Sequence, residues 1–439
     1  MKVPKLYPRN LIDVSQFQKR SFLIPEYRCL STTTNTKKIS FYDSAMLSKY
    51  AKQKIKNITS TELLSYGKNP MSEENFLAYT RFCQEELKVR LAKRVIAFNN
   101  LPFIVGTNPY ISEVHGLYYK AFKNLCVFKP AETLGDEKAY TNALFETIKS
   151  LSNVIQTISE GMYESLRYMK KSSVKAFIDD LISSRIGLRV IGEHQVWLSR
   201  QFYAQLDKAN NLNRSKNFSS EENNSDEDWN GSIHTKLNIL KLMTQCCLHV
   251  QKMCRLHYGI APSFEFDGSL NTKFSYIPSH LEYMSIELLK NAFRASTEKA
   301  IQLQGMQNSI INMFQDEAEN TTKVNPVKIT ISKGGQSVCI KIQDHGGGIR
   351  TEDERSIYDY SFTTYKTRDS EQQEGLGLLS EIHLSNAAGG SIAGLGFGLP
   401  MTKVYAGYFG GSLDLFSMPG HGCDAFLQLP SIEASPKII

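Results

Sequence analysis

The sequence predicts an α+β protein in which an all-α helical bundle is followed by an α/β sandwich. Apolar side chains recur at three- or four-residue steps through most of residues 41–258, which is typical of amphipathic helices. After Pro262 the pattern changes, because residues 327–331 and 338–342 alternate apolar and polar side chains on either side of a Gly-Gly turn. Alternation around such a turn predicts a β-hairpin, so the second half is expected to hold a mixed sheet with helices on one face.

Length and composition limit the classes of protein to which the chain can belong. At 439 residues it is too long for one small domain, and its net charge of +7 is too modest to indicate a nucleic-acid partner. It contains no run of about 18 apolar residues, so we expect no membrane span. Its eight cysteines lack C-x-x-C or metal-ligand spacing, which favours free thiols in a reducing compartment. The predicted organisation is a leader over 1–40, a helical domain over 41–262, an α/β domain over 263–431 and a short tail over 432–439.

The first forty residues are basic and rich in Ser and Thr. They carry eight Lys or Arg residues but only two acidic residues, Asp13 and Glu26. A secretory signal would need a continuous apolar segment, which is absent here, so we interpret this stretch as a mitochondrial transit peptide. A disordered basic tail is the alternative interpretation.

Five long helices are expected in the helical domain, with short turns between most of them. A polar connection over 210–231 is the exception, since it is acidic and has too few apolar residues to order itself. We interpret it as a flexible insertion in preference to a docking or phosphorylation site. The predicted helices cover residues 73–98, 112–126, 138–169, 172–205 and 233–258.

A predicted helix that begins near Ser279 carries the first candidate functional residues. Ser279 is the expected N-cap, with Glu282 three residues later as in a capping box. Glu287 and Asn291 are four residues apart and therefore share one face of this helix, and Arg294 follows three residues later. Alone, this pattern is also that of an ordinary core helix.

Two glycine clusters further along the chain change that interpretation. Asp344 ends a predicted strand and is followed by the glycines 346–348, where the backbone can approach a ligand closely. A carboxylate at such a bend can accept a hydrogen bond from an exocyclic amine such as that of adenine. Gly394, Gly396 and Gly398 open onto a helix with Pro in its first turn, which predicts a phosphate site at the helix N-terminus. Neither the dinucleotide fingerprint nor a P-loop is present.

In this order the three motifs resemble the N, G1 and G2 boxes of the ATP-binding fold shared by gyrase B, Hsp90, histidine kinases and MutL. YIPSHLEYMSIELLKNAFRAS, DHGGGI and GFGLPMTKVYAGYFGGSL are more closely similar to the mitochondrial protein kinases, the family of pyruvate dehydrogenase kinase and branched-chain α-ketoacid dehydrogenase kinase. EELKVRLAKRVIAFNNLP and SSRIGLRVIGEHQVWL resemble the helical bundle of that family. The resemblance covers most of residues 60–430.

The resemblance implies a role for each motif residue. Glu287 would orient and deprotonate the attacking hydroxyl, Asn291 would coordinate the Mg²⁺ that bridges the ATP phosphates, and Asp344 would bind the adenine amine. Residues 365–392 would form a mobile lid. Further residues that would contact the nucleotide are Lys290, Arg294, Gly346, Gly348, Thr363, Thr364, Gly394, Leu395, Gly396, Phe397, Gly398 and Leu399.

The function implied is that of a mitochondrial-matrix protein-serine kinase that uses ATP and Mg²⁺ to phosphorylate and inactivate the E1α subunit of an α-ketoacid dehydrogenase complex. We expect the pyruvate dehydrogenase complex, with the branched-chain complex as the alternative. The family further implies a homodimer that binds the lipoyl domain of the E2 core. The sequence ends at Ile439 without the long tail through which pyruvate dehydrogenase kinases grip lipoyl domains, and this favours the branched-chain enzyme.

Other hypotheses fit the residues less well. The family usually has Arg at the position of His345 and Thr at that of Cys423, so the hydrogen bonds around the nucleotide can differ here. An ATP-hydrolysing conformational machine would use the same boxes, but in such proteins the nucleotide domain comes first. A histidine kinase would require His194 as the phosphate acceptor, although the neighbouring acid precedes this histidine. The presence of all three motifs argues against an inactive scaffold.

Overall fold

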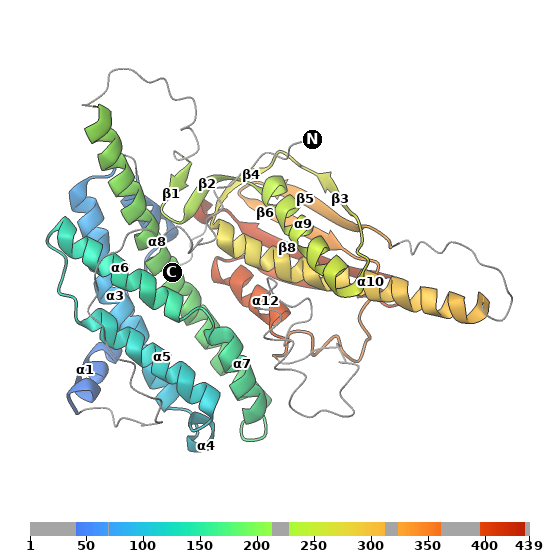
Figure 1. Ribbon diagram of the computed structural model, residues 1–439, viewed down its shortest axis with the longest axis horizontal. Helices are drawn as coiled ribbons and strands as arrows, with labels where there is room; N and C mark the ends of the chain where they lie inside the picture. Colours follow the sequence, from blue (N-terminus) through green and yellow to red (C-terminus); the bar gives the residue numbers. More distant parts are fainter. Residues whose placement is uncertain (1–40, 69, 213–227, 312–323, 361–395, 435–439) are drawn as a thin grey trace. The chain divides into compact units, whose positions relative to one another are not determined.

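The computed structural model describes five stretches of the chain (Figure 1), namely residues 41–68, 70–212, 228–311, 324–360 and 396–434. By their internal contacts the residues divide into two units, 1–45 and 46–439. The predicted transit peptide, most of the acidic insertion and the whole predicted lid lie outside the described residues. Four predicted site residues lie outside them too: Thr363, Thr364, Gly394 and Leu395.

The first part of the described chain is helical, as predicted. The long helix α3 (Glu73–Asn99) packs against α5 (Pro109–Cys126) and α8 (Lys171–Leu212). The Ser72 side chain caps α3 by accepting a hydrogen bond from the Asn75 amide. The remaining helices of this part are α1 (Phe41–Ala51), α2 (Ser60–Tyr66), α4 (Phe103–Gly106), α6 (Leu134–Ser150) and α7 (Val154–Ser165). No helix within the described ranges is both long and apolar enough to cross a membrane.

One helix expected over residues 138–169 is in fact two, α6 and α7, because the helical conformation is interrupted after Ser150. The last carbonyl groups of a helix lack partners within the helix and need donors from elsewhere. The Arg185 guanidinium on α8 donates hydrogen bonds to the carbonyl oxygens of Leu151 and Ser152, where α6 ends. This contact with α8 stabilises a break that hydrophobic periodicity does not reveal.

A second expected helix, over 233–258, begins with a strand. Residues Ile233–Asn238 form β2, which pairs with β1 (Trp229–Asn230) and β4 (Lys273–Tyr276) in a three-stranded antiparallel sheet. Asn238 then caps α9 (Ile239–Tyr258), since its side chain accepts a hydrogen bond from the Lys241 amide. Strand β1 also shows that the end of the predicted insertion is ordered. The helical prediction for residues 233–238 was therefore wrong.

The α/β part is built on a mixed sheet, as predicted, and this sheet has five strands. Its strand order is β3-β5-β6-β8-β7, with β3 parallel to β5 and all other pairs antiparallel. The predicted hairpin is β5 and β6, and its apolar side chains at 327, 329, 331, 338, 340 and 342 are all buried. The strands are β3 (Phe264–Gly268), β5 (Val327–Gly334), β6 (Ser337–Gln343), β7 (Ser412–Met418) and β8 (Gly422–Pro430), and a short 3₁₀ helix, Ile432–Ala434, follows.

Helices α9, α10 (Pro278–Ile311) and α12 (Gly398–Tyr408) belong to the same part of the chain (Figure 1). Helix α10 packs against α9, α12 and the strands β5 and β6, while α12 packs against β7 and β8. Helix α10 begins at Pro278, so Ser279 lies inside it and the predicted N-cap at Ser279 was wrong. The predicted boundary at residue 262 separates β2 and α9 from β4 and α10, which they contact.

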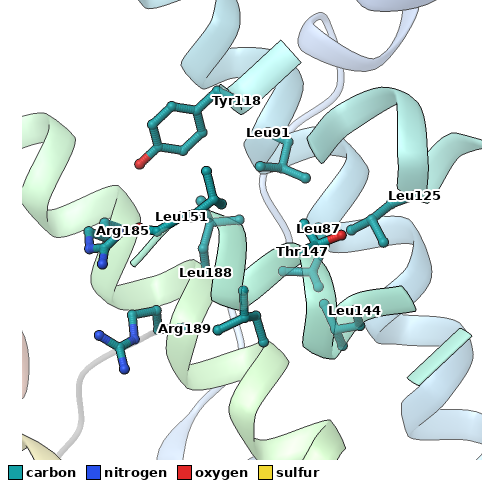
Figure 2. Close-up of a pocket in the computed structure, with 11 residues that line it drawn as sticks. Leu87, Leu91, Tyr118, Leu125, Leu144, Thr147, Leu151, Arg185, Leu188 and Arg189 are labelled. Atoms are coloured by element: carbon teal, nitrogen blue, oxygen red, sulfur yellow. Dashed lines mark hydrogen bonds between the residues drawn. The ribbon is translucent and has the colours of Figure 1, made fainter. Parts of the chain in front are cut away.

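The helical part encloses a cavity between α3, α5, α6 and α8 (Figure 2). Its walls are mainly leucine side chains, and the Tyr118 ring and the two arginines of α8, Arg185 and Arg189, also border it. Arg189 is paired with Glu193 one turn further along α8, with its Nη2 atom 2.6 Å from Glu193 Oε1. The cavity is therefore lined mainly by apolar side chains.

Candidate functional site

Helix α10 carries the acidic and amide residues of the first motif. Glu287 and Asn291 share one face of it, and Asn291 is exposed. The Lys290 ammonium lies 2.8 Å from Glu287 Oε1, and both side chains are largely buried. The ion pair fixes the orientation of the carboxylate, so Glu287 can present its other oxygen in a defined direction.

Arg294 continues this helix toward its middle. Its Nε atom lies 3.8 Å from Glu298 Oε1, a distance at which the two charges attract without a close hydrogen bond. The Glu298 carboxylate also accepts a hydrogen bond of 2.7 Å from the Tyr258 hydroxyl on α9. Arg294 therefore adds a second positive charge near Lys290 on the same helix.

Asp344 lies directly after β6, as predicted, and its carboxylate is buried, with 8% of the residue exposed. Its Oδ1 atom accepts hydrogen bonds from the amides of Gly346 (2.8 Å) and Cys423 (3.3 Å). Among the described residues, the two hydrogen bonds that this carboxylate accepts both go to Oδ1. The Oδ2 atom can therefore accept a hydrogen bond from a ligand. Burial raises the pKa of Asp344 to about 6, more than its backbone hydrogen bonds lower it. At neutral pH the group is therefore a buried, mainly ionised acceptor.

The glycines after Asp344 are required by close packing. A Cβ atom on Gly346 would lie 2.3 Å from the Cβ atom of Ala295 on α10. Gly348 has φ +78°, and a Cβ atom there would lie 2.5 Å from the Met418 carbonyl oxygen. The bend thus fits closely between α10 and the β7–β8 turn, and larger residues are excluded at both positions.

The last glycine motif contacts α10 at Glu287, which is closer to the start of this helix than Ala295 is. Helix α12 begins at Gly398, whose added Cβ atom would lie 2.2 Å from Glu287 Oε2. Gly396 has φ +76°, a conformation that favours glycine, and Phe397 between the two glycines is buried. The amides of the first turn of a helix lack partners within the helix and attract anions. The Glu287 carboxylate therefore lies at the N-terminus of α12, where phosphate oxygens are expected to bind.

The structure thus brings the three motifs together around one face of α10. Residues 287, 291, 295 and 299 follow one another at four-residue steps, and this face runs from Gly398 to the glycines after Asp344. Sequence analysis missed the last two, Ala295 and Lys299. Lys299 lies close to Gly347, since a Cβ atom there would be 3.6 Å from Lys299 Nζ. Extending the spacing of Glu287 and Asn291 by two further turns would have found both.

The structure describes the surroundings of three further residues noted from the sequence. His194 is fully buried, its ring lies 5.3 Å from that of Tyr79, and its Nδ1 atom accepts a hydrogen bond from the Ser232 amide. Burial lowers the pKa of His194 to about 3, so the ring is neutral and shielded, which argues against a phosphate acceptor. His345 donates its amide to the Ser296 hydroxyl of α10, and Cys423 contacts Asp344 through its backbone.

The described residues contain no cluster of three or more His, Cys, Asp or Glu residues that could hold a metal ion. An ion held mainly by substrate phosphates needs only one or two protein ligands, as is usual for Mg²⁺. The exposed Asn291, between the Glu287 carboxylate and Ala295 on the same face, is suited to that role because its amide oxygen is a hard ligand.

Two family models match the chain. Residues 57–234 match mitochondrial branched-chain alpha-ketoacid dehydrogenase kinase, and residues 277–433 match the histidine kinase-, DNA gyrase B- and HSP90-like ATPase model. The second match covers Glu287, Asp344 and Gly398, the three residues around which the site is built.

Curated relatives match along most of their length. The mitochondrial [pyruvate dehydrogenase (acetyl-transferring)] kinase of Arabidopsis thaliana is 27% identical over 85% of this chain and 90% of its own. The Drosophila melanogaster kinase of the same name is 25% identical over 84% and 80%. Isozyme 4 of Mus musculus is 24% identical over 86% and 81%. Over most of its length the chain is therefore similar to the mitochondrial protein kinases, the family of ATP-binding enzymes that includes pyruvate dehydrogenase kinase and branched-chain α-ketoacid dehydrogenase kinase.

Proposed function

We propose that this chain is a protein-serine kinase of the mitochondrial matrix that phosphorylates and inactivates the E1α subunit of the pyruvate dehydrogenase complex. The observation that carries the proposal is the position of the Glu287 carboxylate. One of its oxygens is held by Lys290, and the other faces Gly398 at the N-terminus of α12. A base is thereby placed next to a site for phosphate.

In this mechanism Glu287 accepts the proton of the substrate serine hydroxyl as the serine oxygen attacks the γ-phosphorus of ATP. The bond between this phosphorus and the β–γ bridging oxygen breaks, and ADP leaves. Phosphoryl transfer depends mainly on in-line positioning and on neutralising charge. The cations Lys290 and Arg294 and the amides at the start of α12 supply that charge. Asn291 would hold Mg²⁺, which when bound neutralises the phosphate oxygens.

The remaining residues bind the nucleotide. Asp344 accepts a hydrogen bond from the adenine amine, and Gly346 and Gly348 allow the bend beside it to pack closely against α10 and the β7–β8 turn because neither carries a side chain. We further propose that Thr363 and Thr364 contact the nucleotide and that residues 365–392 cover it as a lid. The phosphates would be held by Gly394, Leu395, Gly396, Phe397, Gly398 and Leu399.

The choice of complex follows the names of the relatives, which are pyruvate dehydrogenase kinases. The branched-chain complex is the second candidate, because the model matched by residues 57–234 is that of the branched-chain kinase. We also propose that the enzyme is a homodimer and that it binds the lipoyl domain of the E2 core. The proposed organisation remains a leader over 1–40, a regulatory bundle over 41–262 and a kinase domain over 263–431.

One assay tests the proposal. Purified protein is incubated with radiolabelled ATP and Mg²⁺ in three reactions, which contain pyruvate dehydrogenase E1, branched-chain E1 or buffer alone. Label on the α subunit of pyruvate dehydrogenase E1 is the expected result, and label only on the branched-chain subunit supports the second candidate. Release of free phosphate without labelled protein would contradict the kinase assignment and indicate an ATPase.

A further inference from the structure

The phosphate end of the site is in contact with α8 of the helical bundle through two aromatic side chains. The rings of Tyr360 and Phe397 lie 5.0 Å apart, and both residues are at least nine-tenths buried. Phe397 stands between Gly396 and Gly398, so its ring anchors the backbone that the two glycines leave flexible. A movement of the Tyr360 ring would therefore change the backbone conformation of this glycine segment through Phe397.

Two residues of helix α8, Asp179 and Lys175, hold Tyr360 in place. The Tyr360 hydroxyl donates a hydrogen bond to the Asp179 carboxylate. The Lys175 ammonium, one turn earlier, lies 5.2 Å from the centre of the Tyr360 ring and donates a 2.7 Å hydrogen bond to the Tyr358 carbonyl oxygen. A hydrogen bond to a charged group is among the stronger ones in proteins. The tyrosine is therefore fixed at its hydroxyl, over its ring and through the neighbouring backbone.

Helix α12 contributes to the same cluster from the other side. The Lys403 ammonium lies 3.8 Å from the centre of the Tyr358 ring, a cation–π contact. The continuous series of contacts is Asp179, Tyr360, Phe397, Gly398 and Glu287, in that order. It joins a bundle helix to the carboxylate proposed as the base.

We propose that Tyr360, held by Asp179, is a positioning residue that sets the conformation of Gly396–Gly398 for binding the phosphates of ATP. This inference rests on the proposed function of the site. Neither residue is assigned to contact the nucleotide, since both act through Phe397. A loop whose conformation is fixed in advance binds a ligand more tightly, because less ordering is required on binding.

The test compares Tyr360→Phe with the unchanged chain. The substitution removes one oxygen and leaves the ring on Phe397, so the packing is retained. Dissociation constants for ATP are measured by titration with a fluorescent analogue, and KM and kcat are measured with E1. We expect the dissociation constant and the KM for ATP to rise roughly fivefold to tenfold, with kcat at saturating ATP within about twofold.

Tyr203→Phe is the matched control. The Tyr203 hydroxyl also donates to a carboxylate, that of Glu137 at 3.0 Å, but this bond lies wholly within the bundle. The control is expected to leave ATP affinity unchanged while lowering thermal stability to a similar extent. A loss of ATP affinity of equal size in both variants would show a general structural effect and would overturn the proposal.

A second variant, Asp179→Ala, keeps the tyrosine and removes its acceptor, so the inference can be tested even if Tyr360→Phe folds poorly. If the two residues act as one unit, the double variant will lose no more ATP affinity than the stronger single variant. Additive losses, or no change in either single variant, would overturn the inference while the kinase assignment stands. If the unchanged chain fails to bind ATP, the proposed function itself fails.

Discussion

The two ends of the candidate site are built in different ways. At the adenine end the Asp344 carboxylate is buried and held by two backbone amides, and glycines 346 and 348 fit against α10 and the β7–β8 turn. At the phosphate end the Glu287 carboxylate is held by a side chain, Lys290, and the glycine segment beside it depends on Phe397 and Tyr360. Backbone therefore sets the first end and side chains set the second.

This difference predicts different consequences of substitution. A group held by backbone amides next to crowded glycines cannot change without affecting both nucleotide affinity and stability. Replacing Glu287 by glutamine keeps the shape of the side chain beside Lys290, so the loss of its charge is expected to appear mainly in the reaction rate. Adenine-end variants should thus change binding and folding together, whereas variants of Glu287 should separate binding from transfer.

The largest effect is expected for Glu287→Gln. The amide keeps the shape of the side chain but accepts no proton, so phosphate transfer to E1 should fall roughly 10²- to 10⁴-fold. The dissociation constant for ATP should change by less than about threefold, because the proposed role concerns transfer and not binding. Both quantities are measured on the same preparation, by initial rates of E1 labelling and by nucleotide titration.

Glu282→Gln is the control for this prediction. Glu282 lies on the same helix, and burial raises its pKa, but it lies near Cys246 of α9 and away from the glycine motifs. Transfer by the control should remain normal. A normal rate of phosphate transfer by Glu287→Gln would contradict the assignment of Glu287 as the proton acceptor.

Much of the fold could be predicted because it depends on local patterns. The β5–β6 hairpin follows from strict alternation, and α3 follows from apolar residues at helical spacing. The errors occurred where a distant contact decides the structure. Residues 233–238 form a strand because β1 and β4 lie on either side of them, and the break after Ser150 is stabilised by Arg185. Strand β4 and Arg185 both lie far in sequence from the residues that they contact, so periodicity carries no sign of these contacts.

In the site, too, features that depend on local sequence could be predicted, whereas features that depend on contacts between distant residues could not. The three motifs could be recognised because each combines a chemical group with a backbone requirement at short range, as at Asp344 and Gly346. Ala295 is required only because Gly346 packs against it, and Asp179 lies far from Tyr360 in the sequence. Contacts of this kind exist only in the folded chain.

Gly346→Ala is expected to have the next largest effect, at the adenine end. The added methyl group would overlap Ala295, so the bend after Asp344 must move. ATP affinity should fall more than about tenfold, and the free energy of unfolding should fall by about 1–3 kcal/mol, as is usual for overpacking. Titration and chemical denaturation measure the two effects.

Gly407→Ala provides the comparison for this variant. Gly407 lies in α12, and a Cβ atom there would meet nothing within 4 Å. Alanine favours a helix over glycine by about 1 kcal/mol, so this variant should keep its ATP affinity and lose no stability. If Gly346→Ala behaved like Gly407→Ala, the close fit around the bend would not govern binding.

Asp344→Asn is expected to weaken ATP binding about tenfold, since a charged acceptor becomes neutral. Its effect on stability should have the opposite sign. Burial holds the pKa of Asp344 at about 6 in the folded chain, above the ordinary value of 3.8. Ionisation of this group is therefore less favourable in the folded state, and its removal should stabilise the protein at pH 7.5 by about 2–3 kcal/mol.

The smallest effect, and the one most specific to the adenine end, is the pH dependence of that stability difference. Between pH 6 and pH 4 the folded chain binds this proton more fully than the unfolded chain does, so the contribution of Asp344 to stability increases as pH falls. The advantage of Asp344→Asn should therefore be constant above about pH 6.5 and shrink as the pH is lowered to 5. ATP affinity of the unchanged chain should fall over the same interval, because the carboxylate becomes protonated. Denaturation curves and nucleotide titrations of both proteins at several pH values measure the two trends. A stability difference that stays the same from pH 7.5 to 5 would mean that burial does not raise the pKa of the Asp344 carboxylate. The adenine end would then not differ from the phosphate end in the way proposed.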